Sequence, residues 1–176
     1  MSVGNIFAVT NQKGGVGKTT TTVNLAASLA DSGKKVLMID LDPQGNATTG
    51  CGIDKDAIET SSYDVIMAEA KASDAIIRPE GLGFDVMPTN TDLTAAEVQL
   101  LEIKLREHRL RLALESSKEK YDFILIDCPP SLSMLTVNAL VASKGVLIPI
   151  QCEYYALEGL TSLLRTIERV KQRANP

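Results

Sequence analysis

Four short apolar runs constrain the fold of this chain most strongly. They are IFAVT (6–10), KVLMID (35–40), DFILID (122–127) and GVLIPI (145–150), and none of them alternates polar with apolar residues. Continuous apolar runs of this length are typical of strands that are buried on both faces of a parallel sheet. A weaker fifth candidate is GFDVMPT (83–89). Because Pro149 cannot donate a ladder hydrogen bond, the fourth run should end there or lie near an edge of the sheet.

Helical patterns lie between these runs. Residues 18–31 carry an apolar face, and Gly33 is the predicted stop of that helix. Residues 132–142 and 155–173 are also predicted to be helical, and Gly45–Ser62 is expected to form a loop region with one short helix. Strands that alternate with helices predict a three-layer α/β fold, in which helices cover both faces of a mainly parallel sheet.

Residues 94–115 are predicted to form one long helix. The segment begins with TAAE, in which Thr94 and Glu97 have the spacing of a capping box. An apolar stripe would then consist of Leu101, Leu105, Leu112 and Ala113. The basic stretch KLREHRLR (104–111), which includes His108, is interpreted as a solvated helix face.

Composition places the chain among single-domain cytoplasmic proteins. The 176 residues are 44% hydrophobic, enough for one sizeable core, so residues 1–176 are expected to form one domain. A net charge of −4 gives no overall attraction to nucleic acid or anionic membranes. The cysteines Cys51, Cys128 and Cys152 form no C-x-x-C pair, which favours reduced thiols over disulfides. No apolar run approaches the roughly 20 residues of a membrane span, and the N-terminus lacks a signal-peptide pattern.

The stretch NQKGGVGKTT (11–20) predicts a phosphate-binding loop. It departs from the pattern G-x-x-x-x-G-K-[ST] only at the first glycine, where Gln12 stands. Such a loop needs a preceding strand and a helix whose N-terminus favours an anion, and residues 6–10 and 18–31 supply both. Gly14, Gly15 and Gly17 permit positive φ and a close approach of the main chain to phosphate oxygens. Lys18 would lie near the β- and γ-phosphates, and Thr19 would offer its hydroxyl to Mg²⁺.

Three carboxylates are predicted to gather near this loop. Asp40 and Asp42 follow the second run, and Asp127 ends the third. Ligands of open parallel sheets bind at the carboxyl ends of the strands, so these side chains suggest a metal and water site. Asp127 would support the hydrated metal, with Asp40 a second candidate for that role. Asp42 precedes Pro43 and is biased toward an extended conformation, from which it could orient or deprotonate water. Cys128 has no histidine partner and is interpreted as a small buried residue.

Four segments together resemble the ParA/Soj-type ATPases that segregate bacterial chromosomes and plasmids. They are KGGVGKTT, LDPQGNATTG, DFILIDCPPSLSMLTVNAL and PIQCEYYALEGL, and the resemblance runs from about Ile6 to Val170. It implies that the nucleotide is bound by Lys13, Gly14, Gly15, Val16, Gly17, Lys18, Thr19 and Thr20. It also implies that Asp42 positions the attacking water, that Asp127 supports the metal, and that Lys13 reaches the ATP of a partner subunit.

The resemblance further implies how such a protein works. ATP or ADP and Mg²⁺ would be its cofactors, and ATP would drive a homodimer that binds DNA without sequence preference. A ParB-type protein would stimulate hydrolysis. The protein would be cytoplasmic, associated with the nucleoid when ATP-bound, and not bound to membrane. Family members usually run further, so the chain is expected to lack the C-terminal third, which contributes adenine contacts and most of the DNA-binding surface.

Three alternatives remain open at this point. A related ATPase that places the division site on the membrane ends in a basic amphipathic helix, and residues 155–173 include Arg165, Arg169, Lys171 and Arg173. The leucines of that segment favour packing on the sheet instead. A redox enzyme similar to the nitrogenase iron protein would need bridging cysteines, which Cys51 and Cys152 do not supply convincingly. The last alternative is a nucleotide-binding module without turnover.

Overall fold

Five strands form one sheet in the order β3-β2-β4-β1-β5. The computed structural model describes residues 4–152 and 159–175. The strands are β1 (Asn5–Val9), β2 (Val36–Asp40), β3 (Asp85–Met87), β4 (Phe123–Asp127) and β5 (Gly145–Leu147). All neighbouring strands pair in parallel, which confirms the predicted parallel sheet and all five candidate strands. Among the described residues, β5 pairs with β1 alone, and it ends before Pro149, as predicted for a strand at the edge.

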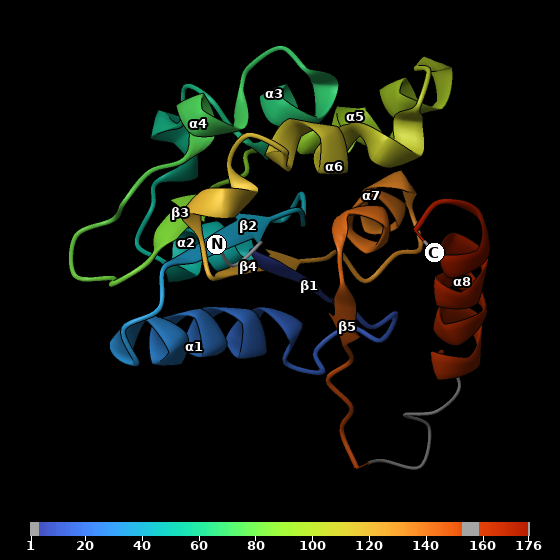
Figure 1. The fold of residues 1–176 in the computed structure, drawn as a ribbon, viewed down its shortest axis with the longest axis horizontal. Coiled ribbons are helices and arrows are strands. Elements are labelled where there is room, and N and C mark those ends of the chain that lie inside the picture. Colours follow the sequence, from blue (N-terminus) through green and yellow to red (C-terminus); the bar gives the residue numbers. More distant parts are fainter. Residues whose placement is uncertain (1–3, 153–158, 176) are drawn as a thin grey trace.

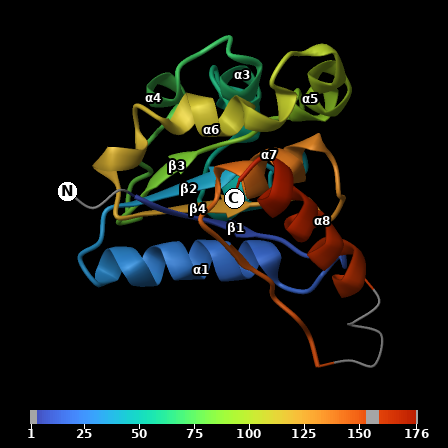
Figure 2. The same ribbon diagram turned by 45° about the vertical axis from the view of Figure 1, so that its right-hand side comes forward.

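Helices cover both faces of this sheet, as Figures 1 and 2 show. α1 (Lys18–Asp31) runs along one face. The other face carries α3 (Ser62–Met67), α4 (Ala72–Ala75), α5 (Leu93–Gln99), α6 (Arg109–Leu114) and α7 (Met134–Ala142). α2 (Asn46–Gly50) packs with α1, and α8 (Leu160–Arg173) packs beside α7. Short 3₁₀ turns are η1 (Lys55–Ala57), η2 (Leu100–Glu102), η3 (Arg106–His108) and η4 (Lys118–Lys120). The predicted three-layer α/β architecture is confirmed.

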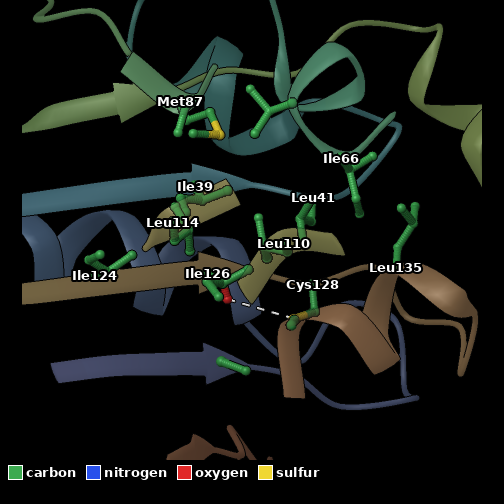
Figure 3. Close-up of a cluster of buried hydrophobic side chains, with 14 of the residues drawn as sticks. Ile39, Leu41, Ile66, Met87, Leu110, Leu114, Ile124, Ile126, Cys128 and Leu135 are labelled. Carbon is green, nitrogen blue, oxygen red and sulfur yellow. Dashed lines mark hydrogen bonds between the residues drawn. The ribbon is translucent and has the colours of Figure 1, made fainter. Parts of the chain in front are cut away.

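The strands are buried on both faces because alternate side chains enter two different clusters. In β2, Leu37 and Ile39 join the cluster beneath α3–α7, whereas Val36 and Met38 join the cluster beneath α1 and α2. β4 divides its side chains in the same way. Figure 3 shows the first cluster, in which strand residues such as Ile124 meet side chains from α3, α6 and α7. A strand with two buried faces favours apolar side chains on both of them, which explains the unbroken apolar runs that precede Asp40 and Asp127.

The prediction of one helix over 94–115 is wrong. The chain breaks between α5 and α6, where Leu105 adopts a left-handed conformation with φ 55°. A 22-residue helix would be about 33 Å long, whereas a five-residue strand spans about 17 Å, so an unbroken helix would project beyond the sheet. The break brings a second short helix back over the core. Asn138 of α7 stabilises it, because its side chain donates to the carbonyl of Arg106 (2.7 Å) and accepts from the N–H of Leu110 (3.1 Å).

Two details of that segment are also corrected. The side chains that enter the core are Leu100, Leu110 and Leu114, whereas the predicted stripe residues Leu101, Leu105 and Leu112 are 53%, 64% and 51% exposed. No capping box forms at Thr94 and Glu97, because the helix already begins at Leu93 after Asp92. The basic stretch is not simply solvated either. Arg109 donates to the carbonyls of Ile66 (3.1 Å) and Met67 (2.8 Å) and so caps the last turn of α3.

The remaining helix predictions agree with the structure at the described residues. α1 ends before Gly33, whose φ of 79° continues no helix. α8 covers most of the predicted 155–173 helix, and residues 153–158 lie outside the described part of the chain. Leu163 is buried, and Ile167 and Val170 pack against the core, whereas Leu164 is exposed. In the described ranges, no helix combines the length and apolar character needed to cross a membrane.

Candidate nucleotide-binding site

The ends of three neighbouring strands bring the predicted site residues together. In the register of the sheet, Asp127 at the end of β4 pairs with Asp40 at the end of β2 and with Val9 at the end of β1. The glycine loop follows β1 directly, and Asp42 lies two residues beyond β2. The loop and the three carboxylates therefore meet at the carboxyl edge of the sheet, as predicted.

The glycine loop has the conformation of an anion-binding turn. Gly15 and Gly17 adopt positive φ (72° and 87°), whereas Gly14, which was expected to share that freedom, does not use it. A Cβ atom added to any of these three glycines would meet no heavy atom within 4 Å, so the surface of the loop is open. Gly17 provides no side-chain cap for α1. The first N–H groups of that helix, from Lys18 to Thr20, therefore favour an anion such as a phosphate.

Contacts from the end of β5 hold this loop in place. Asn11 is buried; its Nδ2 donates to the carbonyl of Pro149 (2.8 Å), and its Oδ1 accepts from the N–H of Lys13 (3.1 Å). Gln151 donates to the carbonyl of Gly15 (3.1 Å). The sequence alone did not identify Asn11 or Gln151 as site residues. Asn11 could have been noticed in the sequence as a turn-forming residue directly after a strand, whereas nothing in the sequence singled out Gln151.

Lys18 lies beneath the loop rather than in solvent. Its side chain is 8% exposed, and Nζ donates to the carbonyl of Lys13 (3.2 Å). Burial lowers the pKa of Lys18, while the carboxylates of Asp127 and Asp42 act to raise it. An ammonium group held between a glycine loop and two carboxylates is well placed to receive a phosphate. The Lys13 side chain is half-buried at the surface of the same loop.

Two threonines of α1 hold the Asp127 carboxylate. Thr19 donates from Oγ1 to Oδ2 (2.7 Å), and Thr22 donates from Oγ1 to Oδ1 (3.1 Å). Burial raises the pKa of Asp127 to about 6, although the hydrogen bonds from Thr19 and Thr22 oppose this shift. Thr22 was not predicted as a site residue. Its spacing of three residues from Thr19 places both hydroxyls on one face of the helix.

Asp40 and Asp42 have different surroundings. Asp42 is 7% exposed, and its Oδ1 accepts from the N–H of Gln44 (3.0 Å). Asp40 is fully buried, and its carboxylate accepts hydrogen bonds from Asp42 and Thr48. Burial and the neighbouring Asp127 carboxylate raise the pKa of Asp40 to about 7. Over residues 4–152 and 159–175, no three His, Cys, Asp or Glu side chains are arranged to hold a metal. A magnesium ion would therefore depend on Thr19 and on phosphate oxygens.

The cysteines do not form a cluster site in this arrangement. Cys128 is fully buried, and its Sγ lies 3.7 Å from the carbonyl oxygen of Ile126 (Figure 3), which agrees with a small buried residue. Burial raises the pKa of Cys51 to about 11 and that of Cys128 well above its usual range, whereas Cys152 is exposed. Protonated thiols are poor ligands for iron, since the thiolate is the ligand.

A separate cavity of about 790 Å³ lies at the opposite edge of the sheet. The start of β1 and the start of β5 line it, together with parts of α6, α7 and α8. None of the predicted site residues contributes to this cavity, so it does not belong to the phosphate loop.

Comparison with known proteins agrees with the geometry. A family model described as "AAA domain" (AAA_31) matches residues 4–176. The sporulation initiation inhibitor protein Soj of Bacillus subtilis is 54% identical over 173 residues, which cover 98% of this chain and 68% of Soj. The chromosome partitioning protein ParA of Caulobacter vibrioides is 52% identical over 173 residues, 97% of this chain and 65% of ParA. The chain thus spans 65% to 68% of the length of these curated relatives.

A solved structure matches the fold and its site region. A Mycobacterium smegmatis protein, described as cobyrinic acid a,c-diamide synthase with bound ATP analog and magnesium, superimposes with a TM-score of 0.95 at 43% identity. The match covers 99% of this chain and 71% of that protein. With the strand order, the glycine loop and the extent of these matches established, the chain belongs to the AAA_31 family of P-loop proteins and, within it, to the ParA/Soj proteins.

Proposed function

We propose that this chain is a single Mg²⁺-dependent ATPase domain of ParA/Soj type that acts in chromosome or plasmid segregation. The observation that carries the proposal is the pair formed by Thr19 and Asp127, 2.7 Å apart beside a glycine loop that faces a helix N-terminus. Relatives at 52% and 54% identity bear the names ParA and Soj. The Mycobacterium smegmatis neighbour is described with an ATP analog and magnesium, which supports the choice of nucleotide and metal.

The loop residues would bind the phosphates. The N–H groups from Gly14 to Thr20 would face the phosphates, since the N–H of Lys13 donates to Asn11, and Lys18 would exchange its hydrogen bond to the Lys13 carbonyl for β- and γ-phosphate oxygens. The Thr19 hydroxyl would turn its lone pairs to Mg²⁺ while still donating to Asp127, and Asp127 would also accept hydrogen bonds from water on the metal. Bound Mg²⁺ would supply charge neutralisation of the phosphates during transfer. Asp40 is less suited to that second role because Asp42 and Thr48 occupy its carboxylate.

Asp42 would orient the attacking water. It is the carboxylate of this edge that lies in a turn beyond the strand, and it interacts electrostatically with Lys18 and Asp127. Its Oδ1 accepts a hydrogen bond from Gln44, and Oδ2 would be the oxygen that holds the water. A carboxylate in this place can fix the direction of attack and receive the proton that the water loses.

Lys13 would couple ATP binding to dimerisation. It lies at the surface of the loop, where a second subunit could approach the nucleotide. A cation from a partner stabilises transition-state charge as a trans-acting arginine does in related enzymes. Since it would contact the γ-phosphate only in a dimer, ATP would favour the dimer over the monomer. The dimer would bind DNA without sequence preference, and a ParB-type protein would stimulate hydrolysis and release it. The protein would then be cytoplasmic, nucleoid-associated when ATP-bound, and not bound to membrane.

The test is phosphate release by the purified chain, with Mg²⁺ or with EDTA, and with or without non-specific duplex DNA. We expect slow, Mg²⁺-dependent hydrolysis that Lys18→Ala abolishes. A fluorescent ATP analogue, measured in parallel, reports binding separately. If the chain binds the nucleotide but releases no phosphate under any of these conditions, it is a nucleotide-binding module and not an ATPase. ATP-dependent co-sedimentation with anionic vesicles, in place of DNA binding, would favour the membrane-associated alternative.

A further inference from the structure

The turn that carries Asp42 is tied to the sheet through a buried carboxylate. Asp40 is the last residue of β2, and its Oδ1 accepts a hydrogen bond from the N–H of Asp42 (3.1 Å). Its Oδ2 accepts two more, from the N–H and from the hydroxyl of Thr48, each 2.8 Å long. Asp40 and Thr48 are both completely buried. The Asp40 carboxylate therefore holds both the beginning of the turn, at Asp42, and the helix that follows the turn, at Thr48.

Thr48 extends this connection to the next strand. Its Oγ1 donates to Asp40 and also accepts from the N–H of Thr89 (3.0 Å), two residues after β3. A hydroxyl can donate and accept at once, so serine could replace threonine here and valine could not. Thr48 thus links the end of β2 to the end of β3.

One further contact, from the N–H of Leu41 to the carbonyl of Asp127 (2.9 Å), fixes the chain just before Asp42, and the remaining contacts leave the turn after it to Asp40 and Thr48. The Asp42 carboxylate accepts from the N–H of Gln44, and the Asp42 main-chain carbonyl accepts from the N–H of Gly45. Both bonds lie within the turn and do not orient it relative to the sheet. Lys55 donates to the carbonyl of Gln44 (2.8 Å), and this contact is solvent-exposed. A buried donor or acceptor that loses its partner costs about 1–3 kcal/mol, more than the loss of an exposed contact. The buried pair therefore sets the direction of the Asp42 carboxylate.

We propose that Thr48 is a positioning residue for the hydrolysis: through Asp40 and Thr89 it holds the turn in the orientation that aims Asp42 at the attacking water. This inference rests on the proposed ATPase function. Within residues 4–152 and 159–175, the Thr48 side chain hydrogen-bonds to Asp40 and Thr89 and not to the glycine loop, so its loss should spare nucleotide binding. Displacement of a catalytic group by about 1 Å can lower a rate by about 100-fold, and a loosened turn should fall within that range.

The test compares three variants by steady-state ATP hydrolysis. Thr48→Val keeps the shape and removes the hydroxyl, Thr48→Ser keeps the hydroxyl, and Thr49→Val changes the exposed neighbour on the same helix. We expect Thr48→Val to lower kcat about 10- to 100-fold while KM and the binding stoichiometry of a fluorescent ATP analogue change less than about twofold. Thr48→Ser and Thr49→Val should retain kcat within about threefold of the unsubstituted chain.

A merely structural role would give a different result, in which Thr48→Val lowers the binding stoichiometry and kcat together. That result overturns the proposal, as does a kcat of Thr48→Val close to that of the unsubstituted chain. If the unsubstituted chain proves inactive, that result counts against the proposed ATPase function and not against the role of Thr48. Hydrogen exchange then tests the role of Thr48 without hydrolysis. The Asp42 amide should exchange at least about tenfold faster in Thr48→Val, while the Leu41 amide, which donates to the Asp127 carbonyl, stays protected. Unchanged exchange at Asp42 overturns the positioning role.

Discussion

Thr19 Oγ1 donates a 2.7 Å hydrogen bond to Oδ2 of Asp127 and joins the first turn of α1 to the end of β4. The two residues are 108 positions apart in the chain. The contact connects the element that would receive phosphate with the carboxylate that would support the metal. It also leads to the first prediction.

Thr19→Val should raise the Mg²⁺ concentration needed for half-maximal hydrolysis by about tenfold or more, because the variant loses a hydroxyl ligand that prefers this hard cation. Thr22→Val is the matched control, since Thr22 also donates to Asp127 but from the next turn. A magnesium titration of hydrolysis distinguishes them. Equal magnesium dependence in both variants would contradict the assignment of Thr19.

Lys18→Ala should weaken ATP binding by about 10- to 100-fold, since charge-assisted hydrogen bonds to phosphate contribute about 1.5–3 kcal/mol. Binding of a fluorescent ATP analogue measures the change. Lys34→Ala, which alters an exposed lysine after α1, should bind as the unsubstituted chain does. Full binding by Lys18→Ala would remove this lysine from the site.

Asp42→Ala should bind ATP normally and lose about 100-fold or more of its hydrolysis rate, because general-base catalysis contributes about 100- to 10,000-fold. Parallel assays of binding and phosphate release separate the two effects. Asp56→Ala, at an exposed carboxylate of η1, provides the control. If Asp42→Ala hydrolyses ATP at the normal rate, another group must activate the water.

Lys13→Gln should bind ATP as a monomer, because the neutral side chain cannot complete the site of a partner subunit. Sedimentation velocity with a non-hydrolysable analogue is the measurement, with Lys34→Gln as the control. An ATP-dependent dimer of Lys13→Gln would refute the contact in trans. A monomeric unsubstituted chain under the same conditions would instead count against the dimerisation switch itself.

The nucleotide-free protein should lose stability as the pH rises from about 4 to about 7. Burial raises the pKa of Asp40 to about 7 and that of Asp127 to about 6, both from 3.8, so the folded state holds these protons more tightly than the unfolded chain. Their stabilising contribution is complete below about pH 4 and disappears as the pH passes through 6 to 7. Urea unfolding without Mg²⁺ should therefore show midpoints that fall with pH. Asp127→Asn should make the urea midpoint depend less on pH, and Asp56→Asn should not. A urea midpoint of the unsubstituted chain that rises with pH would contradict the prediction.

The sequence alone was sufficient for the sheet and for the glycine loop, because both depend on local patterns. The apolar stretch VLMI (36–39) offers no polar side chain to solvent on either face, so it requires burial on both. The loop combines a strand, glycines and a helix start within fifteen residues, from Ile6 to Thr20. Asp42 and Asp127 could be placed at the same edge because parallel strands share one direction.

Contacts between distant residues decided the rest. The chain breaks between α5 and α6 because the core beneath it is shorter than the helical pattern, and Asn138 stabilises the new helix start from α7. Asn11 holds the glycine loop through Pro149, and Thr48 holds the Asp42 turn through Thr89. Such partners lie dozens of residues apart, and a side-chain amide or hydroxyl gives no periodic signal of the group it will meet. Local pattern therefore determined what this protein can bind, whereas tertiary packing determined how firmly each group of the candidate site is held.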